Sequence, residues 1–347
     1  MGISTQSFAA FSSTDSLKPY AFERRALGPK DVLIQIEFCG ICHSDIHTAR
    51  GEWGAVQYPL VPGHEIVGRV LETGKKVTKH RKGDAVGVGC FVDSCGTCGH
   101  CKDHEQQFCS KASFTYSGLE RDGKTPTQGG YSNRIVVNEN YVLKVPKKLD
   151  LARTAPLLCA GITTYSPLAR AKLKKGMKLA VVGLGGLGHM AVKIGKAMGA
   201  EVTVLSTSPN KQPDAKRLGA KHFIVTKDPS ALGEVSSKFD VILDTVSAPH
   251  DIDLLLSTLK KGGQYIVVGV PPEGLKVRST SLIFGRKNLS GSLIGGIRET
   301  QAMLNFCAKK KILADIELIA PQQINEAYER TLKADVKYRF VIDCSKF

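Results

Sequence analysis

The feature that most constrains the fold is an apolar run that leads into a glycine-rich turn, Val181-Val182-Gly183-Leu184-Gly185-Gly186-Leu187-Gly188. It is a Gly-x-Gly-x-x-Gly pattern placed after a predicted strand and before a segment of helical period. The first glycine permits a tight turn, the second lets backbone approach a pyrophosphate, and the third lets the helix pack on the sheet. The helix N-terminus attracts the anion. The pattern is weak by itself, but in this context it predicts a dinucleotide-binding site.

Apolar strands alternate with helical stretches from about Thr154 onward. The helical stretches are Leu187–Met198 and Asp251–Leu259, and we expect the latter to end in the glycines of Lys260–Gly263. Near-continuous apolar strands of this kind predict an α/β fold with a doubly wound parallel sheet covered on both faces. The predicted strands are Leu179–Gly183, Val202–Leu205, Phe223–Val225, Val241–Asp244, Tyr265–Val268 and Leu289–Leu293.

The first 150 residues have a different pattern of short alternating strands and turn-rich connections, at Val32–Phe38, Ile66–Val70 and Ala85–Val88. This pattern predicts an antiparallel β domain. A helix at Thr300–Lys309 and a strand at Arg339–Asp343 are expected to return to it. We therefore expect two domains, one of residues 1–158 with 298–347 and one of residues 159–297.

Composition limits the class of protein and its partners. The chain has 347 residues with 42% hydrophobic side chains, and its longest apolar stretch, near Leu179–Gly188, is far too short to cross a membrane. The formal charge is +16, but the lysines are scattered and lack interleaved aromatics, so neither nucleic acid nor a membrane is expected as a partner. With no signal-peptide pattern at the N-terminus, ten cysteines indicate reduced thiols in the cytoplasm.

Four of the cysteines follow a spacing of two, two and seven intervening residues, at Cys95, Cys98, Cys101 and Cys109. They lie in a Gly-, Ser- and Thr-rich region whose pattern predicts no apolar core. Four thiolates around zinc can fold such a lobe, residues 93–112, by ligation alone. An iron–sulfur cluster is the alternative, but its fourth thiol normally follows after three residues and precedes proline. The spacing therefore favours a structural zinc ion.

A second group of metal-capable side chains begins in the dense run Cys39–His47. Cys42, together with His64 and Cys159, would form a Cys2His site with one open position for water or substrate. Spacing alone does not establish this site, because a buried cysteine more often serves as a small hydrophobe.

The end of the second strand of the nucleotide domain indicates whether the cofactor is NAD or NADP. An acidic residue there would bind the ribose of NAD, but this strand runs into Ser206, Thr207 and, after Asn210, Lys211. Hydroxyls with a lysine suit a 2′-phosphate, so NADP is preferred over NAD. An ordinary serine-rich turn is the alternative.

Taken together, these motifs resemble those of the zinc-dependent medium-chain alcohol dehydrogenases, and within them the cinnamyl-alcohol-dehydrogenase branch with its bacterial relatives. The resemblance covers essentially the whole chain, in five motifs that occur in the expected order. They are Gly40–Asp45, Gly63–Glu65, the four-cysteine lobe, Leu157–Gly161 and Gly183–Gly188. It implies a GroES-like catalytic domain, a Rossmann domain, two zinc ions per subunit, NADP and a homodimer, with a tetramer left open.

The resemblance also implies roles for single residues. Cys42, His64 and Cys159 would hold a catalytic zinc ion with Glu65 as an occasional fourth ligand, and Asp45 would orient His64. Ser44 and His47 would relay the proton. Trp53, Phe114 and Leu293 would line the substrate pocket. The implied cofactor contacts are His43, Thr163, Gly183, Gly185, Gly186, Leu187, Gly188, Ser206, Thr207, Lys211, Val268 and Gly269.

The sequence therefore predicts a zinc-dependent alcohol dehydrogenase and aldehyde reductase. Its substrates would be primary alcohols and aromatic or medium aliphatic aldehydes, with hydride exchanged with NADP(H). Preference for NADPH would make aldehyde reduction the working direction. A zinc-free reductase of the same fold and a non-enzymatic zinc-stabilised binding protein remain as alternatives.

Overall fold

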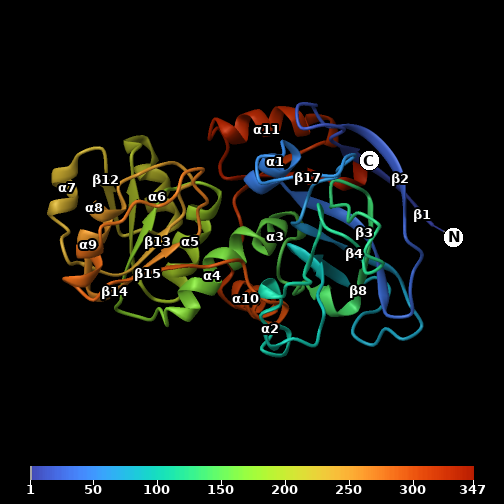
Figure 1. Cartoon of the computed structure of the whole chain (residues 1–347), viewed down its shortest axis with the longest axis horizontal. Helices are drawn as coiled ribbons and strands as arrows, with labels where there is room; N and C mark the ends of the chain where they lie inside the picture. The colour runs from blue at the N-terminus through green and yellow to red at the C-terminus, as the bar shows by residue number, and fades with distance from the viewer. Residues whose placement is uncertain (1) are drawn as a thin grey trace. The chain divides into compact units, whose positions relative to one another are not determined.

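The computed structural model describes residues 2–347, and the chain divides into two units (Figure 1). Unit 1 holds the chain up to Cys159 together with Gly295–Phe347, and unit 2 is Ala160–Ile294. Among the described residues, no helix combines the length and apolar character that crossing a bilayer requires.

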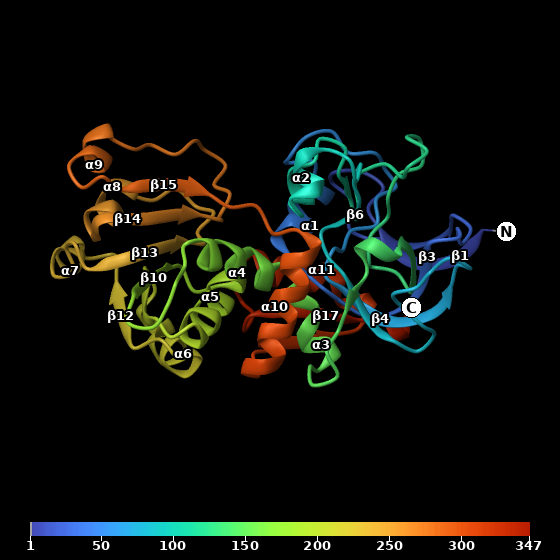
Figure 2. The ribbon, with the colours of Figure 1, turned by 90° about the horizontal axis from the view of Figure 1, so that it is seen from below.

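Unit 2 is built on a six-stranded sheet in the order β12-β11-β10-β13-β14-β15, and every neighbouring pair is parallel (Figure 2). Numbered along the chain, this is the order 3-2-1-4-5-6 of a dinucleotide-binding fold. The predicted doubly wound sheet is confirmed. The strands are β10 (Lys178–Val182), β11 (Glu201–Ser206), β12 (His222–Val225), β13 (Phe239–Asp244), β14 (Leu259–Val267) and β15 (Asn288–Gly291).

One helix of unit 2, α4, precedes β10, and the connections between the strands carry the others. Their apolar sides bury a core in which Phe239, Leu256 and Tyr265 have no exposed surface. Such full burial is what the near-continuous apolar strands require. The helices are α4 (Ala160–Arg170), α5 (Gly186–Ala197), α6 (Gln212–Leu218), α7 (Pro229–Gly233), α8 (Ile252–Ser257) and α9 (Ser279–Ile283).

The predicted helix Asp251–Leu259 is shorter than expected, and its predicted end is wrong. Asp251 caps α8, because its side chain accepts the N–H of Leu254 at 2.9 Å. Leu259 pairs in parallel with Phe239 and begins β14, so the run Lys260–Gly263 lies in a strand. Strand pairing with a distant segment decides this end, and a local glycine pattern does not contain that information.

Unit 1 is organised around β3 (Asp31–Gly40), which pairs antiparallel with three other strands. The sheet order is β16-β17-β3-β4-β5-β9, with β8 also paired to β3, and only the β16–β17 pair is parallel. Val32, Ile34 and Ile36 are fully buried, as their alternation predicts. Its other strands are β4 (Ile66–Thr73), β5 (Ala85–Val88), β8 (Arg134–Asn138), β9 (Leu143–Lys144), β16 (Ile316–Ile319) and β17 (Arg339–Asp343).

Unit 1 also contains two small two-stranded sheets and several helices. Its helix α10 and its strand β17 correspond to predicted elements. The two-stranded sheets are β1 (Ile3–Ala9) with β2 (Lys18–Arg24) and β6 (Phe91–Asp93) with β7 (Ser113–Phe114). The helices are α1 (His43–Ala49), α2 (Gly99–Lys102), α3 (Leu151–Thr154), α10 (Ile297–Lys310) and α11 (Ile324–Leu332).

Candidate metal centres and cofactor site

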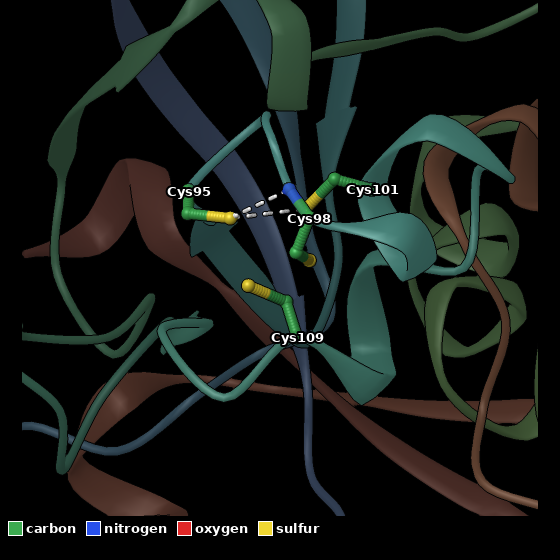
Figure 3. Close-up of side chains that lie close together, drawn as sticks. All are labelled: Cys95, Cys98, Cys101 and Cys109. Atoms are coloured by element: carbon green, nitrogen blue, oxygen red, sulfur yellow. Dashed lines mark hydrogen bonds between the residues drawn. The ribbon is translucent and has the colours of Figure 1, made fainter.

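Four cysteine thiols converge in the lobe that follows β6 (Figure 3). The Sγ atoms of Cys95, Cys98, Cys101 and Cys109 all lie within 4.8 Å of one another. Cys95 Sγ and Cys101 Sγ are 3.8 Å apart. Tetrahedral zinc with bonds of about 2.3 Å holds its sulfurs about 3.8 Å apart, so the group fits a zinc ion.

Backbone N–H groups point at the thiols of this lobe, as a thiolate requires. Cys95 Sγ accepts the N–H of Thr97 at 3.4 Å and of Cys98 at 3.3 Å, and these bonds lower the pKa of Cys95 to about 5. Cys109 Sγ accepts the N–H of Lys111 at 3.4 Å. Two of the four thiols thus have N–H donors that stabilise negatively charged sulfur, the form that binds metal.

A second group joins Cys42, His64, Glu65 and Cys159, whose ligand atoms also lie within 4.8 Å of one another. Cys42 Sγ and Cys159 Sγ are 3.9 Å apart, again a separation that fits zinc. These side chains come from three segments, namely the start of α1, the residues before β4, and the end of a 3-10 helix at Ala155–Leu158. The structure therefore brings together the four residues that the resemblance implied.

Asp45 connects two of these segments. It is the third residue of α1, and its Oδ2 accepts the backbone N–H of Cys42 at 2.9 Å. Its Oδ1 accepts the N–H of Gly63 at 3.1 Å and lies 3.2 Å from His64 Nδ1. With Nδ1 facing the carboxylate, Nε2 of His64 is left for a metal.

Glu65 has one satisfied and one unsatisfied oxygen, although it is fully buried. Oε1 accepts a hydrogen bond from Nη2 of Arg339, while Oε2 has no hydrogen-bond partner in the described residues. Burial raises the pKa of Glu65 to about 7, against the opposing effect of the Arg339 guanidinium. A buried carboxylate oxygen without a donor, beside two thiols and an imidazole, fits a site built for a cation.

The remaining predicted residues of this region lie on and just after α1. Ser44 and His47 are one helical turn apart, and Ser44 Oγ accepts a hydrogen bond from the thiol of Cys42 at 3.6 Å. His47 Nδ1 bonds Glu52 Oε2, and its ring stacks on Trp53 at 5.1 Å between centroids. His43, at the start of α1, is exposed. His47 thus has a route to solvent through Glu52.

Two of the three motif glycines of unit 2 have a steric reason within the chain to be glycine, and the third lies beside open space. Gly183 has φ +87° and closes the turn after β10. A Cβ on Gly188 would meet the carbonyl oxygen of Gly183 at 2.2 Å, whereas a Cβ on Gly185 would meet nothing within 4 Å. Open space at the exposed start of α5 leaves room for an anion. Gly186 and Leu187 supply the first-turn N–H groups of that helix.

The other predicted cofactor residues of unit 2 surround the same end of the sheet. Ser206 ends β11, and its Oγ accepts the N–H of Ser208 at 3.2 Å, while Thr207 is exposed. Lys211 Nζ donates to the Leu184 carbonyl at 3.1 Å, which places a positive charge beside the glycine turn.

Two further backbone positions, Val268 and Gly269, follow β14 and both donate to the Asp244 carbonyl. Thr163 is a buried residue of α4. Because His43 belongs to unit 1, it is the one predicted cofactor residue outside unit 2.

The predicted substrate-pocket residues are all partly exposed. Trp53 is 51% exposed and Phe114, in β7, is 44% exposed, so neither serves as ordinary core. Leu293 belongs to unit 2, is 46% exposed and lines a cavity of about 540 Å³ with residues in and after β14 and β15.

Sequence reasoning did not single out three residues of unit 1 that contact the mixed cluster. Arg339 bonds Glu65, Tyr116 Oη lies 3.2 Å from His64 Nδ1, and Cys90 has a pKa lowered by its hydrogen bond with Cys159. Their partners are between about 50 and 275 positions away along the chain. No local pattern in the sequence predicts contacts between residues so far apart along the chain.

Two family models match the chain. The model described as alcohol dehydrogenase GroES-like domain matches residues 28–147, and the model described as zinc-binding dehydrogenase matches residues 186–309. NADP-dependent alcohol dehydrogenase C 1 of Mycolicibacterium smegmatis is 54% identical over 338 residues, 97% of this chain and 97% of that protein. The chain belongs to the zinc-binding alcohol dehydrogenase family.

Solved structures of the same family superpose on the whole chain. A cinnamyl alcohol dehydrogenase of Sorghum bicolor is 46% identical, with a TM-score of 0.96 over 99% of this chain and 98% of that one. CAD from Helicobacter pylori complexed with NADP(H) is 47% identical, with a TM-score of 0.94 over 100% of this chain and 99% of that one. The predicted resemblance to the cinnamyl-alcohol-dehydrogenase branch is confirmed.

Proposed function

We propose that this chain is an NADP(H)-dependent zinc alcohol dehydrogenase that interconverts primary alcohols and aromatic or medium aliphatic aldehydes. The observation that carries the proposal is the mixed buried cluster of two thiols, an imidazole and a carboxylate, in a chain whose other unit has a dinucleotide-binding sheet. A set of three N and S ligands with a weaker fourth is the chemistry of a catalytic zinc site, while four thiols suit a structural one. The names of the relatives support the activity and the cofactor.

In this proposal unit 1 is the catalytic zinc domain and unit 2 the NADP-binding domain. Cys42, His64 and Cys159 hold the catalytic zinc ion, with Glu65 Oε2 as an alternative ligand. When bound, zinc supplies a Lewis acid for the substrate oxygen and NADP(H) supplies or accepts the hydride.

The chain's own residues bind the cofactor and move the proton. The N–H groups at the start of α5 hold the pyrophosphate, while Ser206, Thr207 and Lys211 hold the 2′-phosphate. Ser44 passes a proton to His47, and Glu52 accepts the Nδ1 hydrogen bond that leaves the other ring nitrogen free for transfer. Trp53 and Phe114 offer apolar surface to the substrate, as does Leu293.

Metal analysis combined with cofactor kinetics tests the proposal. We expect two zinc ions per subunit and faster turnover of a panel of aldehydes with NADPH than with NADH. One zinc ion per subunit without reductase activity would instead favour a zinc-stabilised binding protein. Reductase activity without zinc would favour a zinc-free reductase of the same fold.

We also propose that the enzyme is a cytoplasmic homodimer. Strand β15 forms one edge of the unit 2 sheet, and the neighbouring side chains of Ile283 and Phe284 are 65% and 87% exposed. Large exposed apolar side chains beside a sheet edge favour pairing with a second copy. All ten cysteines are free, which fits a reducing compartment. Light scattering should give twice the subunit mass, and Phe284→Asp should reduce it to one subunit.

A further inference from the structure

We propose that Tyr131 is a positioning residue of the catalytic zinc site, which it holds through the buried carboxylate of Asp45. This inference rests on the proposed function, and it extends the site to a residue that touches neither the metal ligands' donor atoms nor the substrate.

The first observation is the environment of the carboxylate. Asp45 is completely buried, and its two oxygens accept two backbone N–H groups, those of Cys42 and Gly63. A third donor is the phenol of Tyr131, whose hydroxyl donates to Oδ2 at 3.0 Å. Tyr131 Oη is therefore a side-chain hydroxyl donor to this carboxylate, beside the phenol of Tyr116, which also bonds Asp45. A buried anion depends on each of its donors.

The second observation is the direction of the hydrogen bonds. Because an ionised carboxylate only accepts hydrogen bonds, the single proton of Tyr131 points toward Asp45. Tyr328, on α11, donates to Tyr131 Oη at 3.5 Å, and the two rings meet edge to face at 6.3 Å. The donors thus converge on Asp45, from Tyr328 through Tyr131 on one side and from the Nδ1–H of His64 on the other.

The third observation is the main chain of the same segment, which runs along the residues that lead to His64. Tyr131 N–H donates to the Pro62 carbonyl at 3.0 Å, and Gly130 N–H donates to the Gly63 carbonyl at 2.8 Å. The ring of Tyr131 lies against Gly63 so closely that a Cβ there would be 2.6 Å from Tyr131 Cδ1. Backbone and ring together fix the segment before His64.

The fourth observation is the buried guanidinium of Arg24, which forms hydrogen bonds with the segment 128–132 that contains Tyr131. The Arg24 guanidinium donates to the carbonyls of Gln128 and Gly129 at 2.8 and 2.9 Å, and to Ser132 Oγ at 2.9 Å. Burying a guanidinium is costly unless its donors are used, and these bonds go to the residues that carry Tyr131. The segment 128–132 is therefore built as a rigid support.

The alternative is that Tyr131 only fills the core, because its side chain is fully buried. The two explanations differ in what the hydroxyl does. A ring that only packs would tolerate Tyr131→Phe without any effect on metal, whereas a positioning phenol would loosen one zinc ion and leave the other unchanged.

The test is the rate at which each zinc ion passes to a chromogenic chelator under native conditions. Wild-type protein should release two zinc ions in two phases, and a His64→Ala variant marks the phase of the four-cysteine lobe. In Tyr131→Phe we expect the phase of the catalytic zinc ion to become about tenfold faster. Mutating the groups that hydrogen-bond to metal ligands typically lowers metal affinity by about 10–100-fold. The lobe phase should not change. In a cobalt-substituted enzyme the visible spectrum of the same site should shift.

Tyr265→Phe is the matched control. It also removes a buried phenol that donates to a buried aspartate, Asp244, at 2.9 Å, but it lies in unit 2 and outside both thiol groups. Its zinc release should equal that of the wild type. Tyr328→Phe, which removes only the outer and longer bond, should accelerate the same phase less than Tyr131→Phe.

The inference is overturned if Tyr131→Phe releases both zinc ions at wild-type rates, or if both phases accelerate equally as in general destabilisation. The inference is also overturned if Tyr265→Phe accelerates release of the catalytic zinc ion as much as Tyr131→Phe does. Should Tyr131→Phe not fold, an unchanged phase in Tyr328→Phe would count against the chain of hydroxyls. Wild-type protein with zinc only in the lobe would overturn the proposed function itself, and this outcome appears before any variant is made.

Discussion

Alanine substitutions at the glycines around the start of α5 should affect protein stability and cofactor affinity separately. In Gly185→Ala the new methyl group enters open space, because nothing lies within 4 Å of its position. The backbone there, at φ −127°, accepts alanine. Losing a glycine N-cap should therefore cost no more than about 1 kcal/mol of unfolding free energy.

The same methyl group should obstruct the cofactor. It occupies the place from which the pyrophosphate would reach the N–H groups of the helix. Loss of one hydrogen bond to a charged group is worth about 1.5–3 kcal/mol. The dissociation constant of NADPH should therefore rise by about 10–100-fold.

Gly188→Ala should show the opposite balance. Its Cβ would lie 2.2 Å from the Gly183 carbonyl oxygen, so helix and turn must separate by roughly 1 Å to reach ordinary contact. Overpacking of this kind costs about 1–3 kcal/mol.

Urea unfolding and NADPH fluorescence titration of both variants provide the assay. The reasoning is refuted if Gly185→Ala binds NADPH like the wild type, or if Gly188→Ala is as stable as the wild type.

Three further variants test other parts of the proposal. Ser206→Asp should shift the ratio of kcat/KM values from NADPH toward NADH by at least about tenfold, since a carboxylate repels the 2′-phosphate and binds a ribose hydroxyl; an unchanged ratio would contradict the assignment of this strand end. Cys98→Ser should lower the zinc content to one ion per subunit and expose the lobe to proteolysis, because no apolar core holds it; mass spectrometry of the metal and of the fragments measures both, and retention of two ions would reject a structural zinc. His47→Gln should reduce kcat by about 10²-fold or more with little change in NADPH affinity, as expected for a lost proton carrier; a change in KM alone would place His47 in binding.

Most of the nucleotide-binding unit could be predicted because its signals are local. An apolar strand, three glycines and a helical period are neighbours in sequence, and each constrains the backbone within a few residues. The four-cysteine lobe is predictable for the same reason, since its ligands span only residues 95–109. The end of α8 was not predictable, because Leu259 becomes a strand residue only by pairing with Phe239.

The sequence by itself determined the residue types that can bind zinc and a dinucleotide, and the spacing that keeps the lobe and the glycine turn together. Only the tertiary structure decided which partners surround the mixed cluster. Arg339 reaches Glu65, and Tyr131 reaches Asp45, across 274 and 86 positions of the chain. Buried charges must find their donors wherever the packed core places them, and that placement depends on the whole fold. For this reason the ligands of the site could be anticipated, while the residues that hold the ligands could not.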